Sequence, residues 1–107
     1  MSRPVTLRPE VARFAQLMER VLRDNDHKGG WKDMEAADLL KRLRDETKEL
    51  AQAIESQAVR CGCRSADECR HGLFAAGSTD IVREAVDVAN FAMMVADVFS
   101  MDIDCDH

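Results

Sequence analysis

Two pairs of acidic residues have the spacing with the clearest chemical meaning in this chain. They are Glu46-x-x-Glu49 and Glu84-x-x-Asp87. Residues three apart on a helix lie on nearly the same face, so each pair can direct two carboxylates at one point. Four carboxylates gathered between two helices would repel one another unless a cation lay among them, and hard oxygen ligands favour Mg²⁺ or Mn²⁺. The spacing therefore predicts a divalent-metal site, although acidic residues are also common on solvated helix faces.

The first pair lies in a segment whose apolar residues mark one seam of a helix. We expect this helix to run from about Met34 to Ala58, with Leu43 and Leu50 on the seam. Glu46 occupies the step between these two leucines, where packing alone favours an apolar residue. A buried carboxylate without a partner is costly, so this position favours a site between helices. The remaining charges are interpreted as ordinary surface charge: Lys41, Arg42, Asp45 and Lys48.

The second pair lies in a segment that is apolar over most of its circumference. The run Gly77-Ser-Thr-Asp80 offers good N-cap residues, and we expect a helix from there to about Phe99. Its polar residues fall within one sector, which contains Glu84, Asp87 and Asn90. A helix of this kind must be buried on more than one side.

A further helix, beginning at Pro9, completes an all-α protein with three main helices per chain. The 107 residues support a single domain, with tails at 1–8 and 100–107 and an insertion loop at 57–78. Three helices cover the apolar surface of the last helix poorly. We therefore expect a homodimer or homotetramer in which self-association completes a four-helix-type core.

The composition excludes several classes of protein. Hydrophobic residues make up 46% of the chain and charged residues 33%, which is typical of a soluble helical protein and not of a disordered one. The net charge of −5 leaves no broad basic surface for polymeric nucleic acid. The N-terminus lacks the apolar core of a signal peptide, and Asn90 and Asp97 interrupt the longest apolar stretch. We expect a cytoplasmic protein that does not bind membranes.

The loop between the first two helices has the unusual sequence His27-Lys-Gly-Gly-Trp-Lys-Asp33. Its paired glycines allow backbone N–H groups to turn toward an anion. Lys28 and Lys32 add positive charge, and Trp31 offers a ring on which a base can stack. The loop thus predicts one half of a nucleotide pocket. The alternative is a connecting turn in which Trp31 plugs the end of the core.

Three cysteines and a histidine gather in the insertion loop: Cys61, Cys63, Cys69 and His71. Three thiols and an imidazole within so short a segment can hold a tetrahedral Zn²⁺ of structural type. Their spacing is not one of the common zinc-finger patterns, so free cysteines in an exposed insertion are the alternative.

Together these motifs resemble the MazG-like, all-α nucleoside triphosphate pyrophosphohydrolases, including small phage-type members with a His-Lys-Gly-Gly-Trp loop. The resemblance spans about Phe14 to Phe99. The residues that carry it are Trp31-Lys-Asp33, Asp45-Glu46-x-x-Glu49 and Glu84-x-x-Asp87 with Asn90. In that family, Glu-Glu-x-x-Glu on one helix and Glu-x-x-Asp on the next bind Mg²⁺ together. This chain differs at Asp45, in its longer insertion, and in having no basic residue after Asp87 on the same helix.

The resemblance implies hydrolysis of a nucleoside triphosphate, or its deoxy form, between the α- and β-phosphates. It makes four carboxylates the Mg²⁺ ligands: Glu46, Glu49, Glu84 and Asp87. It also places Asn90 near the nucleotide sugar or phosphates. Either Glu46 or Glu49 would orient or deprotonate the attacking water. Lys28, Lys32 and Lys48 are the candidates for phosphate binding in this chain.

Two other classes of protein share some of these features. A di-iron carboxylate bundle needs Glu-x-x-His on two helices, and no histidine stands three residues after Glu46 or Glu84. A non-catalytic helical module that oligomerises, or binds nucleotide or zinc without turnover, fits the helical periodicity equally well. It leaves the position of Glu46 on an apolar seam unexplained.

Overall fold

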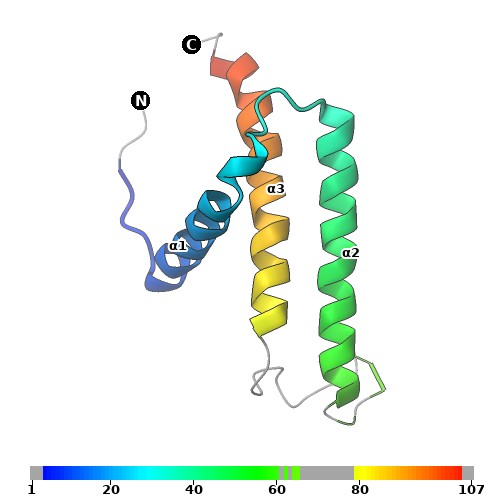
Figure 1. The fold of residues 1–107 in the computed structure, drawn as a ribbon. Helices are drawn as coiled ribbons and strands as arrows, with labels where there is room; N and C mark the ends of the chain where they lie inside the picture. The colour runs from blue at the N-terminus through cyan, green and yellow to red at the C-terminus, as the bar shows by residue number, and fades with distance from the viewer. Residues whose placement is uncertain (1–3, 61, 63, 66–78, 105–107) are drawn as a thin grey trace.

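Three α-helices make up most of the described part of the chain. The computed structural model describes residues 4–60, 62, 64–65 and 79–104. The helices are α1 (Pro9–Asp24), α2 (Ala36–Arg60) and α3 (Thr79–Asp104), and a short 3-10 helix, η1 (Asp26–Lys28), follows α1 (Figure 1). No strand occurs among the described residues, so the all-α class predicted from the sequence is confirmed.

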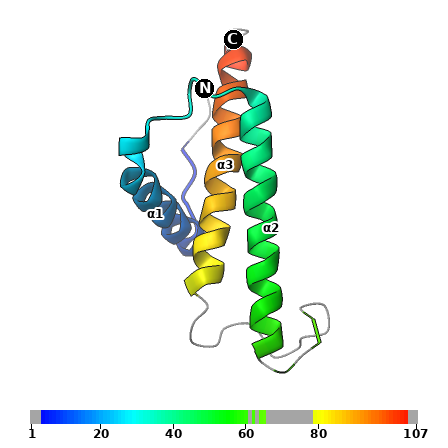
Figure 2. The ribbon, with the colours of Figure 1, turned by 45° about the vertical axis from the view of Figure 1, so that its right-hand side comes forward.

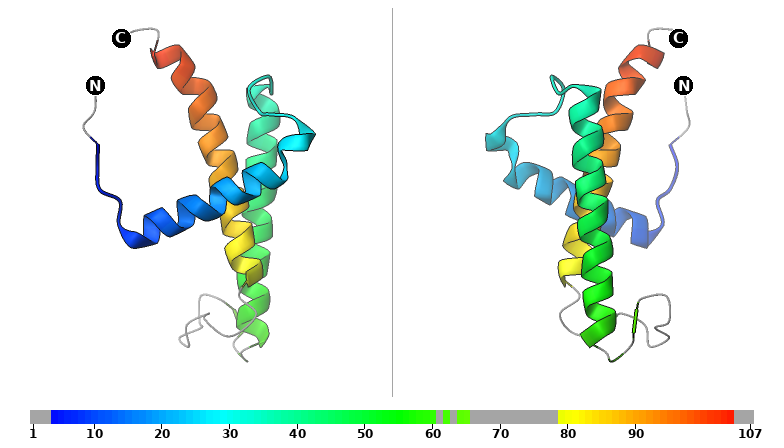
Figure 3. Two further views of the ribbon diagram at one scale, coloured as in Figure 1. Left: turned by 60° about the vertical axis from the view of Figure 1, so that its left-hand side comes forward. Right: turned by 90° about the vertical axis from the view of Figure 1, so that its right-hand side faces the viewer.

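Helix α3 is the central element of the fold. Helices α2 and α3 run antiparallel and side by side (Figures 1 and 2). Helix α1 lies obliquely across α3, as both views of Figure 3 show. Helix α3 packs against both other helices, whereas α1 and α2 are not packed against each other within the described residues. The last helix is therefore contacted by two helices, although Val86 and Asn90 are the only residues of its described part that are buried.

Helix α1 begins at Pro9, ends at Asp24 and is capped by Asn25. The first turn of a helix leaves its N–H groups unpaired, so the missing N–H of Pro9 costs nothing there. At the other end, the side-chain amide of Asn25 donates to the carbonyl oxygen of Val21 at 2.9 Å, and the backbone N–H of Asn25 donates to the same oxygen at 3.2 Å. Gly29 then adopts a φ of 90°, which favours glycine, and the chain turns toward the start of α2.

Helix α2 continues past its predicted end. A helix end near Ala58 and an insertion loop at 57–78 are the predictions for this region, but the helix extends to Arg60. Gln57 and Ala58 are both buried, so packing inside the molecule stabilises the turn where the sequence period fades. The residues of the predicted zinc site lie outside the described part of the chain: Cys61, Cys63, Cys69 and His71.

Helix α3 also runs further than its sequence indicates. Its predicted end near Phe99 is replaced by an end at Asp104, so residues 100–104 of the expected tail are helical. The hydroxyl of Ser100 donates to the carbonyl oxygen of Asp97 at 3.0 Å, a local bond that is compatible with a continuing helix. No glycine or proline stands in this segment to stop it.

The core of a single chain is small. The apolar side chains that are almost fully buried in the described part are Leu39, Ala58 and Val86. Helix α1 contains no buried residue. The radius of gyration is 16.7 Å, compared with about 13 Å for a compact domain of this length. No described helix is both long enough and apolar enough to cross a membrane.

Candidate metal centre

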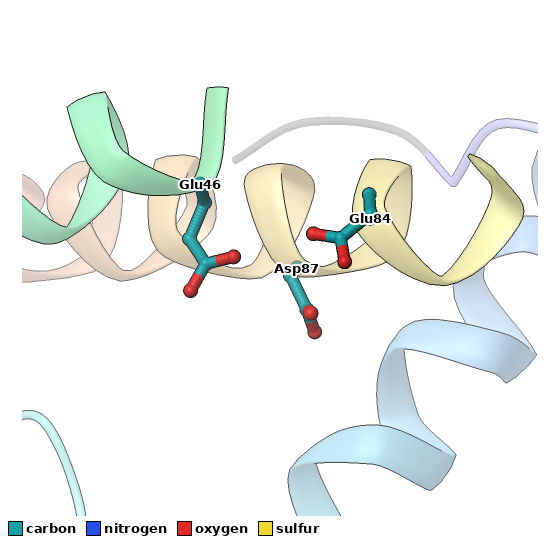
Figure 4. A group of neighbouring side chains, drawn as sticks. All are labelled: Glu46, Glu84 and Asp87. Atoms are coloured by element: carbon teal, nitrogen blue, oxygen red, sulfur yellow. The ribbon is translucent and has the colours of Figure 1, made fainter. Parts of the chain in front are cut away.

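Three carboxylates from two helices meet at one point between α2 and α3. Glu46 comes from α2, and Glu84 and Asp87 come from one face of α3 (Figure 4). One oxygen atom from each side chain lies within 4.8 Å of the others, and all three residues are half-buried. We call these three residues the carboxylate cluster. Helical spacing explains the geometry, because Glu84 and Asp87 are three residues apart and Glu46 sits on the seam that faces α3.

Two oxygens of the carboxylate cluster are buried without a partner. Glu46 Oε2 and Glu84 Oε2 have no hydrogen-bond donor among the described residues. The nearest cationic atom recorded for the cluster is Arg42 Nη2, at 3.8 Å from the other oxygen of Glu46. Buried polar atoms are normally paired, and buried charges are paired or bind metals. Ligand oxygens around an octahedral Mg²⁺ lie about 3 to 4 Å apart, so a small contraction of the cluster would suffice to bind such an ion.

The pKa values of the cluster show the same excess of negative charge. Burial, followed by the neighbouring carboxyl of Glu49, raises the pKa of Glu46 to about 7. Burial and then Glu49 raise the pKa of Glu84. Burial raises the pKa of Asp87 as well, although Arg83 opposes the shift. The protein thus holds these carboxyl groups where their ionised forms lack solvation, a condition that a bound cation would relieve.

Glu49 is the predicted ligand that lies beside the three-residue cluster and not within it. It lies one turn beyond Glu46 on α2, is exposed, and lines a separate shallow cleft together with Glu84. Three residues correspond to a rotation of about 60° away from Glu46 around the helix. Glu49 nevertheless raises the pKa of both Glu46 and Glu84, so it lies at the edge of the cluster. The structure therefore brings three of the four predicted ligands together and places the fourth beside them.

A cleft of about 450 Å³ adjoins the carboxylate cluster and is walled by parts of all three helices and the loop before α2. We call it the three-helix cleft. Its residues with charged or hydrogen-bonding side chains are Asn25, Lys28, Trp31, Arg42, Glu46, Arg83, Asp87 and Asn90. The loop that the sequence assigned to a nucleotide pocket thus lies opposite the acidic residues of α2 and α3. Lys28 and Trp31 line the cleft as that prediction requires.

Asn90 is buried in the wall of the cleft, with 3% of its surface exposed. Its side-chain amide donates to the carbonyl oxygen of Met18 at 3.3 Å. Its Oδ1 atom is buried and has no donor within the described part of the chain. An acceptor held in this way can receive a hydrogen bond from a ligand hydroxyl or amine.

Lys32 is predicted from the sequence to bind substrate, but it is not among the residues that line the cleft. Its Nζ atom is 2.9 Å from Asp97 Oδ2 in an ion pair. Trp31 Nε1 donates to the same oxygen at 3.0 Å. Sequence reasoning missed this role for Asp97, although the residue falls in the polar sector of α3, which is the signal that could have found it.

Two arginines of the cleft were also missed by sequence reasoning. Arg42 was interpreted as surface charge, but it lines the cleft and its Cζ atom lies 5.1 Å from the ring centroid of Phe91. Arg83 lines the opposite side from α3. The available signal was spacing: Arg42 is one turn before Glu46, and Arg83 directly precedes Glu84. The two arginines that line the cleft therefore come before the acidic pairs in the sequence and not after them.

An antiparallel helix pair crossed by a third helix, with a carboxylate cluster beside a basic cleft, defines an all-α protein with a candidate divalent-metal centre. The chain matches no protein-family model, and the comparisons with curated proteins and with solved structures give no match. The chemistry of the cleft therefore has to be inferred from its own residues.

Proposed function

We propose that this protein is a Mg²⁺-dependent nucleoside triphosphate pyrophosphohydrolase of the MazG-like type, with Mn²⁺ as a possible substitute. The observation that carries the proposal is the pair of buried, unpartnered oxygens of Glu46 and Glu84. They belong to a carboxylate cluster of which Glu46 and Asp87 also line the three-helix cleft. An acidic cluster beside basic residues and an aromatic ring suits a metal-bound polyphosphate carrying a base. The products would be a nucleoside monophosphate and pyrophosphate.

Each acidic residue has a distinct part in this proposal. Glu46, Glu84 and Asp87 would hold the cation, since their oxygens already converge. When bound, Mg²⁺ supplies charge neutralisation on the phosphates and lowers the pKa of the attacking water. Glu49 lies at the edge of the cluster, and either it or Glu46 would orient that water and accept its proton.

The other residues of the cleft are assigned to the substrate. Lys28, Arg42 and Arg83 are the basic residues that line it, and we assign them to the phosphates. Trp31 would stack against the base, and the unpaired Oδ1 of Asn90 would accept from a sugar hydroxyl.

We also propose that the chain forms a homodimer or homotetramer that completes a four-helix-type core. Helix α1 has no buried residue, and large apolar side chains on every helix stay exposed, including Val11 and Phe99 at 50% each. Analytical ultracentrifugation tests this directly. A sedimentation mass of one chain across the micromolar range would contradict the proposal.

Turnover assays test the enzymatic proposal. Purified protein is incubated with each ribo- and deoxyribonucleoside triphosphate and Mg²⁺, and pyrophosphate and monophosphate are quantified. We expect equimolar release of both products, abolished by a chelator and reduced at least about 100-fold by Glu84→Gln. Asp45→Asn is the matched control, because Asp45 adjoins Glu46 in sequence but pairs with Lys41 on the exposed face of α2.

Three other results of this assay would contradict the proposal. Release of inorganic phosphate in place of pyrophosphate would indicate cleavage at another bond. Turnover that persists in the chelator would exclude the metal centre. Nucleotide binding without turnover of any of them would identify the protein as the non-catalytic nucleotide-binding module.

A further inference from the structure

One carboxylate oxygen of α3 fixes the loop before α2. Asp97 Oδ2 accepts from Trp31 Nε1 at 3.0 Å and from Lys32 Nζ at 2.9 Å, although these residues are more than sixty positions apart. The bond to Lys32, and then the bond to Trp31, lower the pKa of Asp97. The two donors therefore meet an ionised carboxylate at neutral pH. Figure 1 shows this loop passing beside the upper part of α3.

The rest of the loop does little to hold Trp31 in place. Gly29 and Gly30 have open space where a side chain would begin, and both are exposed. The backbone bond from Met34 N to Trp31 O, at 3.0 Å, shapes the turn but leaves the indole free to rotate about its own side-chain bonds. Lys32 Nζ lies 5.9 Å from the indole centroid, so the residue that completes the ion pair also sits over the ring.

The bond to Asp97 also decides what Trp31 offers to the cleft. Indole has a single hydrogen-bond donor, Nε1, and Asp97 occupies it. The side chain still lines the three-helix cleft, so only the carbon atoms of its rings remain to contact a ligand there. A ring surface can stack on any base and cannot distinguish hydrogen-bonding groups.

We infer that Asp97 is a positioning residue, which holds the Trp31 indole as a stacking wall for the base of a bound nucleotide. The inference rests on the proposed function for the nature of the ligand. Asp97 lies ten residues beyond Asp87 on the same helix, or about 15 Å along its axis. Loss of Asp97 therefore acts on binding of the base, which appears in KM, and leaves kcat nearly unchanged.

Trp31 is the only tryptophan in the chain, so tryptophan fluorescence reports on the surroundings of this one indole. The informative variants are Asp97→Ala, which removes both bonds, and Asp97→Asn, which keeps an acceptor for Nε1 and removes the charge. The matched control is Asp45→Ala, because Asp45 has a similar ion pair, with Lys41 Nζ at 3.2 Å, on an exposed face of α2. Circular dichroism confirms that each variant keeps its helices.

Two readouts are compared in these variants. The first is the emission maximum and acrylamide quenching of Trp31. The second is the affinity for a nucleoside triphosphate and for inorganic tripolyphosphate, both with Ca²⁺ as a slow substitute for Mg²⁺. We expect Asp97→Ala to shift emission to the red, to increase quenching and to weaken nucleotide binding about tenfold. Tripolyphosphate, which has no base, should bind within twofold of the wild type. In both readouts, Asp97→Asn should give values between those of Asp97→Ala and the wild type, and Asp45→Ala should match the wild type.

Two results would overturn the inference. Unchanged emission and quenching in Asp97→Ala would show that Asp97 does not fix the indole. An equal loss of affinity for nucleotide and tripolyphosphate would show a general structural role. If the wild type binds no nucleotide, the proposed function fails and the stacking role fails with it, while the fluorescence still decides whether Asp97 positions Trp31.

Discussion

Glu46 of α2 and Glu84 of α3 bring carboxylate oxygens within 4.8 Å of each other, and each also holds a buried oxygen that no donor in the described part of the chain reaches. Neither helix gains stability from this arrangement in the absence of a cation, because like charges repel and both groups are partly desolvated. At a pH where both carboxyls are ionised, the relationship is thus a stability cost that a bound cation would offset, and it makes the site testable without an activity assay.

Addition of a divalent cation should raise the thermal stability of the wild type. At a concentration one hundred times the dissociation constant, binding to the folded state alone contributes about 2.7 kcal/mol. For a chain of this size that corresponds to a rise in Tm of roughly 10 °C or more. Differential scanning fluorimetry with Mg²⁺, Mn²⁺ and a chelator measures it.

The Glu84→Gln variant separates this effect from nonspecific stabilisation by salt. In the chelator, the variant should be more stable than the wild type by about 1 kcal/mol, because one buried negative charge is removed. With Mg²⁺ the wild type should be the more stable of the two, because the cation stabilises the Glu84→Gln variant only slightly. Asp45→Asn should follow the wild type in both conditions, since its carboxylate is exposed and paired with Lys41. Equal metal-induced shifts in the wild type and Glu84→Gln would contradict the assignment.

The raised pKa values predict how the stability of the metal-free protein depends on pH. The pKa of Glu46 rises from an ordinary value of 4.5 to about 7. A raised carboxyl pKa gives stability that is complete below the ordinary value and is lost as the pH rises through the folded value. The free energy of unfolding should therefore fall between about pH 5 and pH 8, by on the order of 2 kcal/mol. The shifts of Glu84 and Asp87 act in the same direction.

Urea denaturation at several pH values in a chelator measures this slope. Saturating Mg²⁺ should flatten it, because the cation favours the ionised carboxylates. Glu46→Gln should remove most of it in the chelator. Stability that increases from pH 5 to pH 8 in the metal-free wild type would be incompatible with the raised pKa values.

The parts of the structure that the sequence predicts are those set by the period of a helix. Leu39 is fully buried and Leu43 and Glu46 are half-buried, so the seam of α2 faces inward as its spacing indicates. Spacing fixes which residues share a face of one helix, but it does not say which faces of different helices meet. The contact of Trp31 with Asp97 depends on the path of the loop across α3, and no pattern in either segment specifies that path.

Glu49 shows the same limit within a single helix. A three-residue step puts two carboxylates on nearly one face, yet the 60° between them is enough to leave Glu49 exposed at the edge of the cluster. The way in which α2 packs against α3 decides whether Glu46 or Glu49 points inward. The position of Arg42 in the cleft could not be predicted for the same reason, because its neighbours come from α3 and include the ring of Phe91.

Arg42 and Arg83 should be needed for binding of polyphosphate. Each lines the three-helix cleft, from α2 and α3 respectively, and a charge-assisted hydrogen bond to phosphate contributes about 1.5 to 3 kcal/mol. Replacing either by glutamine should weaken tripolyphosphate binding roughly 10- to 100-fold in isothermal titration calorimetry. The loss should be greatest at low ionic strength, because salt screens exposed charges.

Two matched variants on α2 control for the loss of positive charge. Arg44 and Lys48 are exposed and are not among the residues that line the cleft. Arg44→Gln and Lys48→Gln should each change tripolyphosphate affinity less than about threefold. The sequence names Lys48 as a phosphate-binding candidate, so this comparison also decides between Lys48 and the two arginines. A loss with Lys48→Gln as large as with Arg83→Gln would favour the sequence-based assignment.

Leu39 and Leu40 are neighbours in sequence with opposite environments at the start of α2. Leu39 is fully buried, whereas 45% of Leu40 is exposed. Leu39→Ala leaves a cavity in a core that has few other buried side chains, and should lower the free energy of unfolding by about 2 to 5 kcal/mol. Leu40→Ala is the matched variant. Alanine is a strong helix former at either position, so a difference between the two variants reports packing and not helix propensity. Chemical denaturation followed by circular dichroism at 222 nm measures both.

Leu40→Ala has two possible outcomes, which depend on self-association. In an isolated chain the exposed leucine contributes little, and its removal should cost less than about 1 kcal/mol at any protein concentration. If the face that carries Leu40 is covered by a second copy, the cost rises toward that of Leu39→Ala, and the unfolding midpoint of the wild type increases with protein concentration. A small cost for Leu39→Ala would contradict the full burial of Leu39 within one chain, because no change in assembly fills the cavity that the substitution leaves.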